Sequence, residues 1–257
     1  MIINGILGHP LKKPRSIKIW KYFFKKKKIK ASMLKFEIAP EKLNDFFSYI
    51  KKEKNFKAMA VTMPYKKTVI KYLDTLDDFA QKAKSVNLIV KKNRKLKGYN
   101  TDIFGAMNTI KFFINRYDKI VIIGLGGTGQ AIFNYLISKY KKNYFIISKK
   151  FKLKKKNNKV TIKKFFDKKA VTSPALVINC TPLGSNLKKI YINKSPIKEK
   201  FFPYINKTSV IFDIIYSPKK TILSKYCFKN KIKYFNGLDM NTLQAERALQ
   251  IAFGTKI

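Results

Sequence analysis

Apolar residues recur with two different periods along the first hundred residues of this chain. Short apolar runs predict strands, and they cover residues 2–7, 32–38, 56–62, 87–92 and 96–100, the last two as a hairpin. Between them, apolar residues every three or four positions predict helices after Ser16 and after Pro40, and a polar turn and helix within 74–84. This alternation of strands and helices is typical of an α/β layer.

The second half of the chain continues the alternation with shorter and more apolar strands. The predicted strands cover residues 120–123, 144–147, 176–181 and 210–216, and the predicted helices cover 102–115, 130–136 and 238–253. The helix at 102–115 connects the two halves. We therefore expect an α/β protein with a division near residue 102.

A glycine-rich loop follows the predicted strand at 120–123. It has the pattern G-x-G-G-x-G and consists of Gly124, Leu125, Gly126, Gly127, Thr128 and Gly129. Glycines permit a tight turn and let a pyrophosphate approach the backbone amides, while the dipole of the following helix favours the anion. The strand before the loop and the helix after it indicate a dinucleotide site, although a structural turn without a ligand has the same pattern.

The composition is strongly basic. The 57 Lys and Arg residues outnumber the 14 Asp and Glu residues and give a formal net charge of +43. A charge of this size often indicates nucleic-acid binding, but these lysines are spread along the whole chain. They accompany Ile, Phe, Tyr and Asn, which have A/T-rich codons. We interpret the charge as compositional drift and do not expect nucleic acid as a partner.

Other residue types exclude further classes of protein. At 46% hydrophobic residues the chain can bury a core, which argues against global disorder. Cys180 and Cys227 lack the spacing of a metal or redox site, and His9 is the single histidine, so we expect no metal. No apolar run reaches the roughly 18 residues of a membrane span. The first residues lack the features of a signal peptide, so we expect a cytoplasmic protein without a membrane partner.

Lysines stand where an NAD-binding protein usually carries an acid. Ser148, Lys149 and Lys150 follow the predicted strand at 144–147. A carboxylate at this point holds the ribose 2′-hydroxyl of NAD, whereas cations attract the 2′-phosphate of NADP. The pattern favours NADP over NAD, but the general excess of lysine would produce it too.

Lys66 and Asp102 are the candidate acid–base pair. Lys66 ends V-T-M-P-Y-K and Asp102 lies in G-Y-N-T-D-I-F-G, both at predicted boundaries between strand and helix. A carboxylate within reach of an ammonium orients it, and such a pair can supply the proton that reduction of a ketone requires. Plainer interpretations are Lys66 as a surface lysine and Asp102 as the N-cap of the following helix.

Seven motifs have the order and spacing found in shikimate dehydrogenases. They are V-T-M-P-Y-K, S-V-N, G-Y-N-T-D-I-F-G, G-L-G-G-T-G, N-C-T-P-L-G, D-I-I-Y-S-P and G-L-D-M-N-T-L-Q. From Gly8 onward the chain resembles this family, whose members reduce 3-dehydroshikimate to shikimate with NADPH in chorismate and aromatic amino acid biosynthesis. The resemblance implies two α/β domains across a cleft: a substrate-binding domain of residues 1–101 and 238–257, and a Rossmann-type NADP domain of residues 102–237.

The resemblance also implies roles for individual residues. Lys66 would be the catalytic acid and base, with Asp102 as its partner. The substrate would be held by Ser16, Thr62, Lys66, Asn87, Asp102, Tyr216 and Gln244. The cofactor would be held by the loop 124–129 at the pyrophosphate, by Ser148 and Lys149 at the 2′-phosphate, and by Ile214 and Gly237 near the nicotinamide, with Asp78 where the family often has an acid near the cofactor. In plainer interpretations, Asn87 satisfies a backbone turn and Tyr216 is a core tyrosine.

Several positions depart from the family pattern. Pro14 replaces the first of two serines, and Ala60 replaces an asparagine. Ser148 and Lys149 replace Asn-Arg, and Leu153 replaces a later arginine. Because lysine makes a point contact rather than a bidentate one, we expect weaker binding of substrate or cofactor than in a sequence that keeps these groups.

Two other functions fit parts of the sequence. A sister enzyme that oxidises quinate or uses NAD would share the motifs. A basic nucleic-acid-binding protein on a decayed dehydrogenase scaffold would share the charge, but the retained Lys66, Asp102 and glycine loop argue against decay. We expect a monomer or homodimer that acts on a small-molecule substrate.

Overall fold

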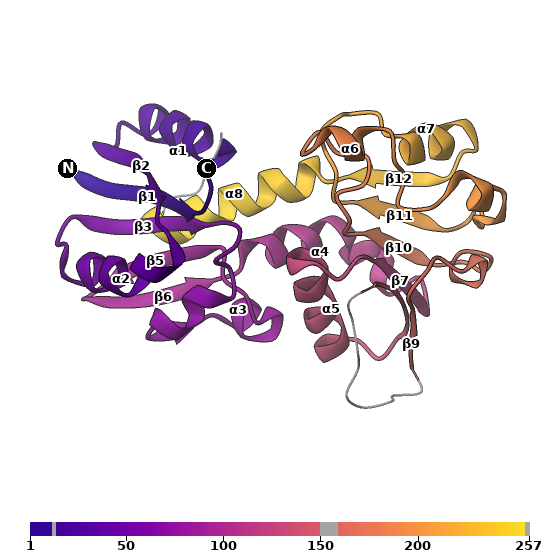
Figure 1. The fold of residues 1–257 in the computed structure, drawn as a ribbon, viewed down its shortest axis with the longest axis horizontal. Helices are drawn as coiled ribbons and strands as arrows, with labels where there is room; N and C mark the ends of the chain where they lie inside the picture. The colour runs from indigo at the N-terminus through magenta and orange to yellow at the C-terminus, as the bar shows by residue number, and fades with distance from the viewer. Residues whose placement is uncertain (12–13, 150–158, 255–257) are drawn as a thin grey trace. The chain divides into compact units, whose positions relative to one another are not determined.

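The computed structural model describes residues 1–11, 14–149 and 159–254 (Figure 1). The chain divides into two compact units, the first formed by Met1–Gly105 with Thr242–Ile257 and the second by Ala106–Asn241. Within the described residues, each unit is built on a six-stranded sheet with helices packed against it. The prediction of an α/β protein is therefore confirmed.

The first unit has a mixed sheet with the strand order β2-β1-β3-β5-β6-β4. Its strands are β1 (Ile2–Gly8), β2 (Ala31–Glu37), β3 (Phe56–Val61), β4 (Thr75–Leu76), β5 (Leu88–Lys92) and β6 (Lys95–Tyr99). Strands β1, β2 and β3 are parallel, whereas β5 is antiparallel to β3 and to β6. Asn93 and Arg94 both have positive φ and form the tight turn of the predicted β5–β6 hairpin.

Helices cover both faces of this sheet. They are α1 (Arg15–Lys26), α2 (Leu43–Lys52), α3 (Asp78–Ala83), the start of α4 (Thr101–Ile114) and most of α8 (Leu238–Phe253), with 3-10 helices η1 (Pro40–Lys42) and η2 (Thr68–Tyr72). Successive strand residues point to opposite faces, so the sheet separates two cores. Met59 and Ile89 pack with α2 on one face, whereas Ala58 and Leu88 pack with α1 and α8 on the other.

The second unit has a parallel sheet with the strand order β12-β11-β10-β7-β8-β9. Its strands are β7 (Lys119–Ile123), β8 (Asn143–Ile147), β9 (Val160–Lys163), β10 (Leu176–Asn179), β11 (Val210–Asp213) and β12 (Lys233–Asn236). Its helices are the rest of α4, α5 (Gly127–Lys139), α6 (Lys189–Ile192) and α7 (Ile222–Lys229), with 3-10 helices η3 (Lys168–Ala170) and η4 (Glu199–Tyr204). The strand order reverses beside β7, and parallel sheets bind dinucleotides outside the carboxyl ends of the strands at such a point.

The structure corrects several predicted elements. The strands expected at 210–216 and 176–181 end earlier, at Asp213 and Asn179. Residues 74–84 contain the short strand β4 before α3. Strands β9 and β12 were not predicted, because both lie at the edges of the second sheet, are four residues long and have no fully buried residue.

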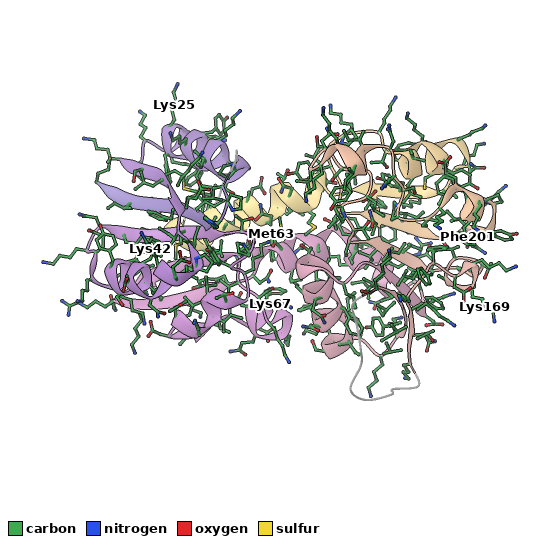
Figure 2. The ribbon with its side chains drawn as sticks, in the orientation of Figure 1. Lys25, Lys42, Met63, Lys67, Lys169 and Phe201 are labelled. Atoms are coloured by element: carbon green, nitrogen blue, oxygen red, sulfur yellow. The ribbon has the colours of Figure 1, made fainter. Side chains whose placement is uncertain are left out.

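Lysine side chains extend from the surface of each unit, as Figure 2 shows for Lys25 on α1. This distribution agrees with the even spread of lysine along the sequence. In the part of the chain that the structure describes, no helix combines the length and the apolar character needed to cross a membrane.

Candidate active site

Lys66 and Asp102 form an ion pair in the first unit. The Nζ atom of Lys66 lies 2.5 Å from Oδ2 of Asp102, and the two side chains are 27% and 19% exposed. Lys66 belongs to the turn after β3, and Asp102 belongs to the first turn of α4. Partial burial strengthens their attraction relative to water while leaving the pair open to a ligand. A lysine held in this way can give or take a proton at a ligand oxygen.

The segment 85–87 ties both partners of this ion pair to the same piece of backbone. The amide of Val86 donates to the carbonyl of Lys66 at 2.7 Å. On the other side, Nδ2 of Asn100 donates to the carbonyl and to the hydroxyl of Ser85, both at 2.8 Å. The distance between Lys66 and the start of α4 is therefore set by short backbone and amide contacts.

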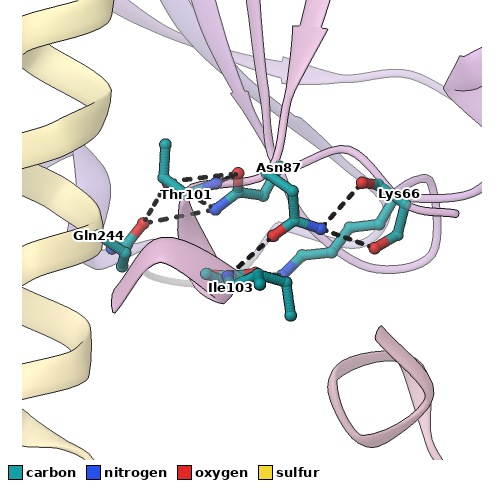
Figure 3. Close-up of polar contacts among 8 residues, drawn as sticks. Lys66, Asn87, Thr101, Ile103 and Gln244 are labelled. Atoms are coloured by element: carbon teal, nitrogen blue, oxygen red, sulfur yellow. Dashed lines mark hydrogen bonds and ion pairs between the residues drawn. The ribbon is translucent and has the colours of Figure 1, made fainter. Parts of the chain in front are cut away.

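Asn100 also caps α4. Its Oδ1 accepts from the amide of Ile103 at 3.0 Å, which is the N-cap arrangement (Figure 3). The interpretation of Asp102 as the N-cap is therefore wrong, and its carboxylate is left to pair with Lys66. Asn100 was not predicted as a cap, although an asparagine directly before a predicted helix is a typical capping signal.

Asn87, Thr101 and Gln244 form a second polar group in the same unit. Oδ1 of Asn87 accepts from the amide of Thr101 at 2.7 Å, and its Nδ2 donates to the Thr101 hydroxyl at 2.9 Å. Oε1 of Gln244, on α8, accepts from Nδ2 of Asn87 at 3.5 Å and from the Thr101 hydroxyl at 3.3 Å (Figure 3). The structure thus joins Asn87 to Gln244, which lies 157 positions further along the chain, and Thr101 joins both to the helix that carries Asp102.

Three other predicted residues of this unit lie in different settings. Thr62 directly follows β3, is half-buried, and donates its amide to Leu7 at 2.9 Å. Ser16 is half-buried in the first turn of α1. Asp78 pairs with Lys82 along α3 at 2.5 Å and is 61% exposed. The hydrogen bonds and ion pairs of the described residues do not connect Ser16 or Asp78 to the Lys66–Asp102 pair.

The glycine-rich loop of the second unit is held by close backbone contacts. Gly124 has φ of +90°, and its amide donates to the carbonyl of Ile147 at 2.8 Å. A Cβ atom at Gly129 would lie 2.0 Å from the carbonyl oxygen of Gly124. A side chain at either position would therefore displace the backbone.

The middle of the same loop is open. A Cβ atom at Gly126 or Gly127 would meet nothing within 4 Å, while Leu125 and Thr128 are half-exposed. Gly126 is the N-cap of α5, no side chain caps this helix, and its first turn has no acidic residue. The first amides of α5 are therefore left for an external anion, and this open cradle fits a pyrophosphate.

The carboxyl end of β8 carries no acid in the residues that are described. The amide of Ser148 donates to the carbonyl of Lys163 at 3.0 Å, and Lys149 is exposed. Lys150 and Leu153 lie outside the described residues. The two described residues can offer a hydroxyl and a cation to a phosphate, which would fit the 2′-phosphate of NADP.

Ile214 and Gly237 meet at the neighbouring strand ends of the second unit. The amide of Gly237 donates to Ile215 at 3.1 Å, and a Cβ atom at Gly237 would lie 2.1 Å from the carbonyl oxygen of Ile214. A glycine is therefore required where these two backbones approach each other. Tyr216 is half-buried in the same unit. Among the described residues, no group of three or more His, Cys, Asp or Glu side chains could hold a metal ion.

Comparison with known proteins agrees with the motifs. Residues 6–89 match the model of the shikimate dehydrogenase substrate binding domain. The NADP(+) shikimate dehydrogenase of Clostridium beijerinckii is 32% identical over 255 residues, which cover 98% of this chain and 92% of that protein. Its counterpart in Clostridium botulinum is 31% identical over 97% of this chain and 95% of that protein. The crystal structure of shikimate dehydrogenase 1 from Peptoclostridium difficile is similar with a TM-score of 0.80 at 28% identity, covering 100% of this chain and 93% of that one.

Proposed function

We propose that this chain, which belongs to the shikimate dehydrogenase family, catalyses the reversible reduction of 3-dehydroshikimate to shikimate with NADPH. The observation that carries this proposal is the Lys66–Asp102 ion pair, at 2.5 Å, in a unit where Asn87 and Gln244 also meet. These are residues that the resemblance assigns to the reaction and to the substrate. The reaction would serve the biosynthesis of chorismate and the aromatic amino acids.

Lys66 is the acid and base in this proposal. Its ammonium gives a proton to the oxygen that gains negative charge as the ketone is reduced, and the neutral amine takes the proton back in the reverse direction. Asp102 holds the ammonium in one orientation through the 2.5 Å contact. Because the ammonium is paired before the substrate arrives, little reorganisation is needed when the charge develops.

The remaining substrate contacts are proposed on chemical grounds. Asn87 and Gln244 each carry an amide that can donate to one hydroxyl and accept from another, which suits a polyhydroxylated ring. Thr62 and Ser16 offer hydroxyls from the first unit, and Ser16 is proposed for the substrate carboxylate. Tyr216 belongs to the second unit, and its role rests on the family resemblance.

We propose the second unit as the NADP-binding domain. NADPH, when bound, supplies the hydride. The open backbone at Gly126 and Gly127 would hold the pyrophosphate, Ser148 and Lys149 the 2′-phosphate, and Ile214 and Gly237 the nicotinamide end. The first unit is then the substrate-binding domain, in agreement with the family model that covers residues 6–89. For Asp78, a place near the cofactor is proposed from the family resemblance alone.

NADP is proposed over NAD because the described end of β8 carries Ser148 and Lys149 rather than an acid. The relatives named above are NADP(+) enzymes. A cytoplasmic location is proposed from the reducing environment expected for the two buried free thiols, Cys180 and Cys227.

The test is a coupled absorbance assay of the purified protein with four combinations: shikimate or quinate, with NADP or NAD. We expect fast turnover with shikimate and NADP, and much slower turnover in the other three combinations. Faster turnover with quinate, or with NAD, would replace the proposal with the sister activity. Absence of turnover in all four by a protein that binds NADP would overturn it.

A further inference from the structure

One carboxylate of the second unit is fully buried and takes no part in the proposed reaction. Asp213 ends β11 and is 0% exposed. Its Oδ1 accepts from Nδ2 of Asn179 at 2.9 Å and from the amide of Ile215 at 3.0 Å, and its Oδ2 accepts from the hydroxyl of Tyr234 at 2.9 Å. Burial raises the pKa of Asp213 to about 6, although these three hydrogen bonds act in the opposite direction. Burial of a carboxyl group costs free energy of folding, so its three hydrogen bonds indicate that it holds neighbouring groups in place.

The three donors come from three neighbouring strands, two of them from the carboxyl end of a strand or just beyond it. Asn179 ends β10, Ile215 lies two residues beyond the strand that Asp213 ends, and Tyr234 lies in β12. These strands are adjacent in the sheet, and their carboxyl ends form the edge at which a parallel sheet binds a dinucleotide. The side chain of Asp213 therefore links β10, β11 and β12 to one another.

On one side, the contacts lead to the glycine-rich loop. Asn179, held by Asp213, accepts with its own Oδ1 from the amide of Thr181 at 2.9 Å and from the Thr181 hydroxyl at 2.8 Å. Thr181 in turn packs against Gly124, where a Cβ atom would lie 2.6 Å from Cγ2 of Thr181. The side chain of Asp213 thus reaches the first glycine of the loop through two intermediates.

On the other side, the contacts lead to Ile214 and Gly237. The hydrogen bond from Ile215 to Asp213 fixes the chain directly after β11. The carbonyl of Ile215 accepts from the amide of Gly237. The carbonyl oxygen of Ile214 lies so close to Gly237 that a Cβ atom there would be 2.1 Å from it. Both ends of the proposed cofactor site are therefore tied to the same oxygen, Oδ1 of Asp213.

We infer that Asp213 is a positioning residue for the cofactor, whose Oδ1 holds the glycine-rich loop, through Asn179 and Thr181, and the Ile214–Gly237 pair in the geometry that binds NADP. The inference rests on the proposed function, because it needs NADP at this edge. It predicts that the hydrogen-bonding capacity of Oδ1 matters for NADP affinity more than the negative charge does.

The test compares two substitutions at this position. Asp213→Ala removes both contacts of Oδ1, and we expect the Kd for NADP to rise about tenfold, the size expected for lost hydrogen bonds that hold a site. Asp213→Asn keeps an oxygen for Asn179 and Ile215 and turns its amide toward Tyr234, whose hydroxyl can rotate to accept. We expect this variant to bind NADP within about threefold of the unsubstituted chain, since a single altered contact is involved.

A matched control separates positioning from general loss of stability. Ser209 is 1% exposed, accepts from the amide of Ala175 at 3.1 Å, and lies at the opposite end of β11. Ser209→Ala also removes a buried hydrogen bond and should lower the melting temperature, but it should leave the Kd for NADP unchanged. The Kd is measured by calorimetric titration at a temperature where every variant is folded.

The outcomes are distinct. An unchanged Kd in Asp213→Ala, an equal rise in Ser209→Ala, or equal losses in Asp213→Ala and Asp213→Asn would each overturn the inference. If Asp213→Ala does not fold, Asn179→Ser takes its place, because it shortens the side chain between Asp213 and Thr181. Its NADP affinity should fall several-fold, and an unchanged affinity would overturn the inference. If the unsubstituted chain does not bind NADP, the proposed function itself has failed.

Discussion

The two units hold their ionic groups in opposite ways. In the first unit the charged residues, Lys66 and Asp102, lie at the partly exposed site, and neutral amides hold the backbone segments that carry them. In the second unit the candidate pyrophosphate site is glycine backbone, and the carboxylate that supports it, Asp213, is buried and connects to it through Asn179 and Thr181. In the first unit, therefore, amides support a charged contact site. In the second unit, a carboxylate supports a contact site made of backbone amides.

This difference follows from what each unit is proposed to do. Transfer of a proton needs a titratable group that reaches the substrate, so the ion pair must remain accessible. Binding of a pyrophosphate needs closely spaced amides, which a glycine-rich turn at a helix N-terminus presents, so the side chains that stabilise the loop must leave these amides open. Substitutions in each unit can test this division.

The largest effect is expected for Lys66→Ala. Removal of a general acid–base group costs roughly 10²–10⁴-fold in rate, so kcat should fall by this factor. The Kd for NADP should remain unchanged, because the lysine belongs to the other unit. The neighbouring Lys67 is exposed, and Lys67→Ala serves as the control that should keep full activity. Comparable losses of kcat in both variants would remove Lys66 from its proposed role.

The sequence predicted the site better where function depends on contiguous motifs. Lys66, Asp102 and the glycine-rich loop each lie in a short run of residues whose chemistry is readable without a fold. Asn100 and Asp213 were not assigned, because their partners lie on other elements and become visible only when the strands are paired. The sequence predicted a strand that continues to residue 216. It therefore did not indicate that Asp213 ends β11 and accepts a hydrogen bond from Asn179 on the neighbouring strand.

The edges of the second sheet were missed for a different reason. Strands β9 and β12 are four residues long and contain no fully buried residue, so neither has the apolar run that predicts a buried strand. In the central strands β7, β10 and β11, by contrast, nearly every residue is buried, and the apolar run alone was sufficient.

The stability of the folded chain should depend on pH through Asp213. Burial raises the pKa of Asp213 from 3.8 in the unfolded chain to about 6. Between these values the folded protein keeps a proton that the unfolded chain has released. The free energy of unfolding should therefore fall as the pH rises from about 4 to about 6, by about 3 kcal/mol from this group.

The measurement is urea denaturation of the unsubstituted chain and of Asp213→Asn across this pH range. The difference between the two curves isolates Asp213 from the other carboxylates. The titratable groups that face it, Tyr234, Cys227 and Cys180, have pKa values raised by burial and stay neutral throughout. Parallel curves for the two proteins would contradict a buried, weakly acidic Asp213.

A smaller effect is expected for Asn100→Ala in the first unit. This change leaves the carbonyl of Ser85 and the amide of Ile103 without the partners they have now, at a cost of about 1–3 kcal/mol in the free energy of unfolding. Because the start of α4 also carries Asp102, kcat should fall more than the KM for shikimate rises. Ser85→Ala removes only one hydroxyl acceptor and should cost less. Equal effects on kcat from both variants would show that Asn100 does not position the helix.

The smallest effect on stability, with the opposite sign, is expected for Gly127→Ala. Apart from its chain neighbours and the backbone of its own helix, a methyl group there would meet nothing within 4 Å, and Gly127 is the first residue of α5. Replacing a helical glycine with alanine usually stabilises by about 0.4–1 kcal/mol, because the unfolded chain loses freedom. The same methyl group would fill the open side of the loop, so NADP affinity should fall while the melting temperature rises.

Gly129→Ala provides the contrast, since its methyl group would lie 2.0 Å from the carbonyl oxygen of Gly124. This variant should lose both stability and NADP affinity, because the loop backbone must move. Thermal unfolding and calorimetric titration of the two variants therefore distinguish the two glycines. Gly127 would leave space for the ligand, whereas Gly129 allows the close approach of the Gly124 backbone. If Gly127→Ala bound NADP as well as the unsubstituted chain, the open side of the loop would not be where the pyrophosphate binds, and the proposed division between contacting backbone and buried support would fail in the second unit.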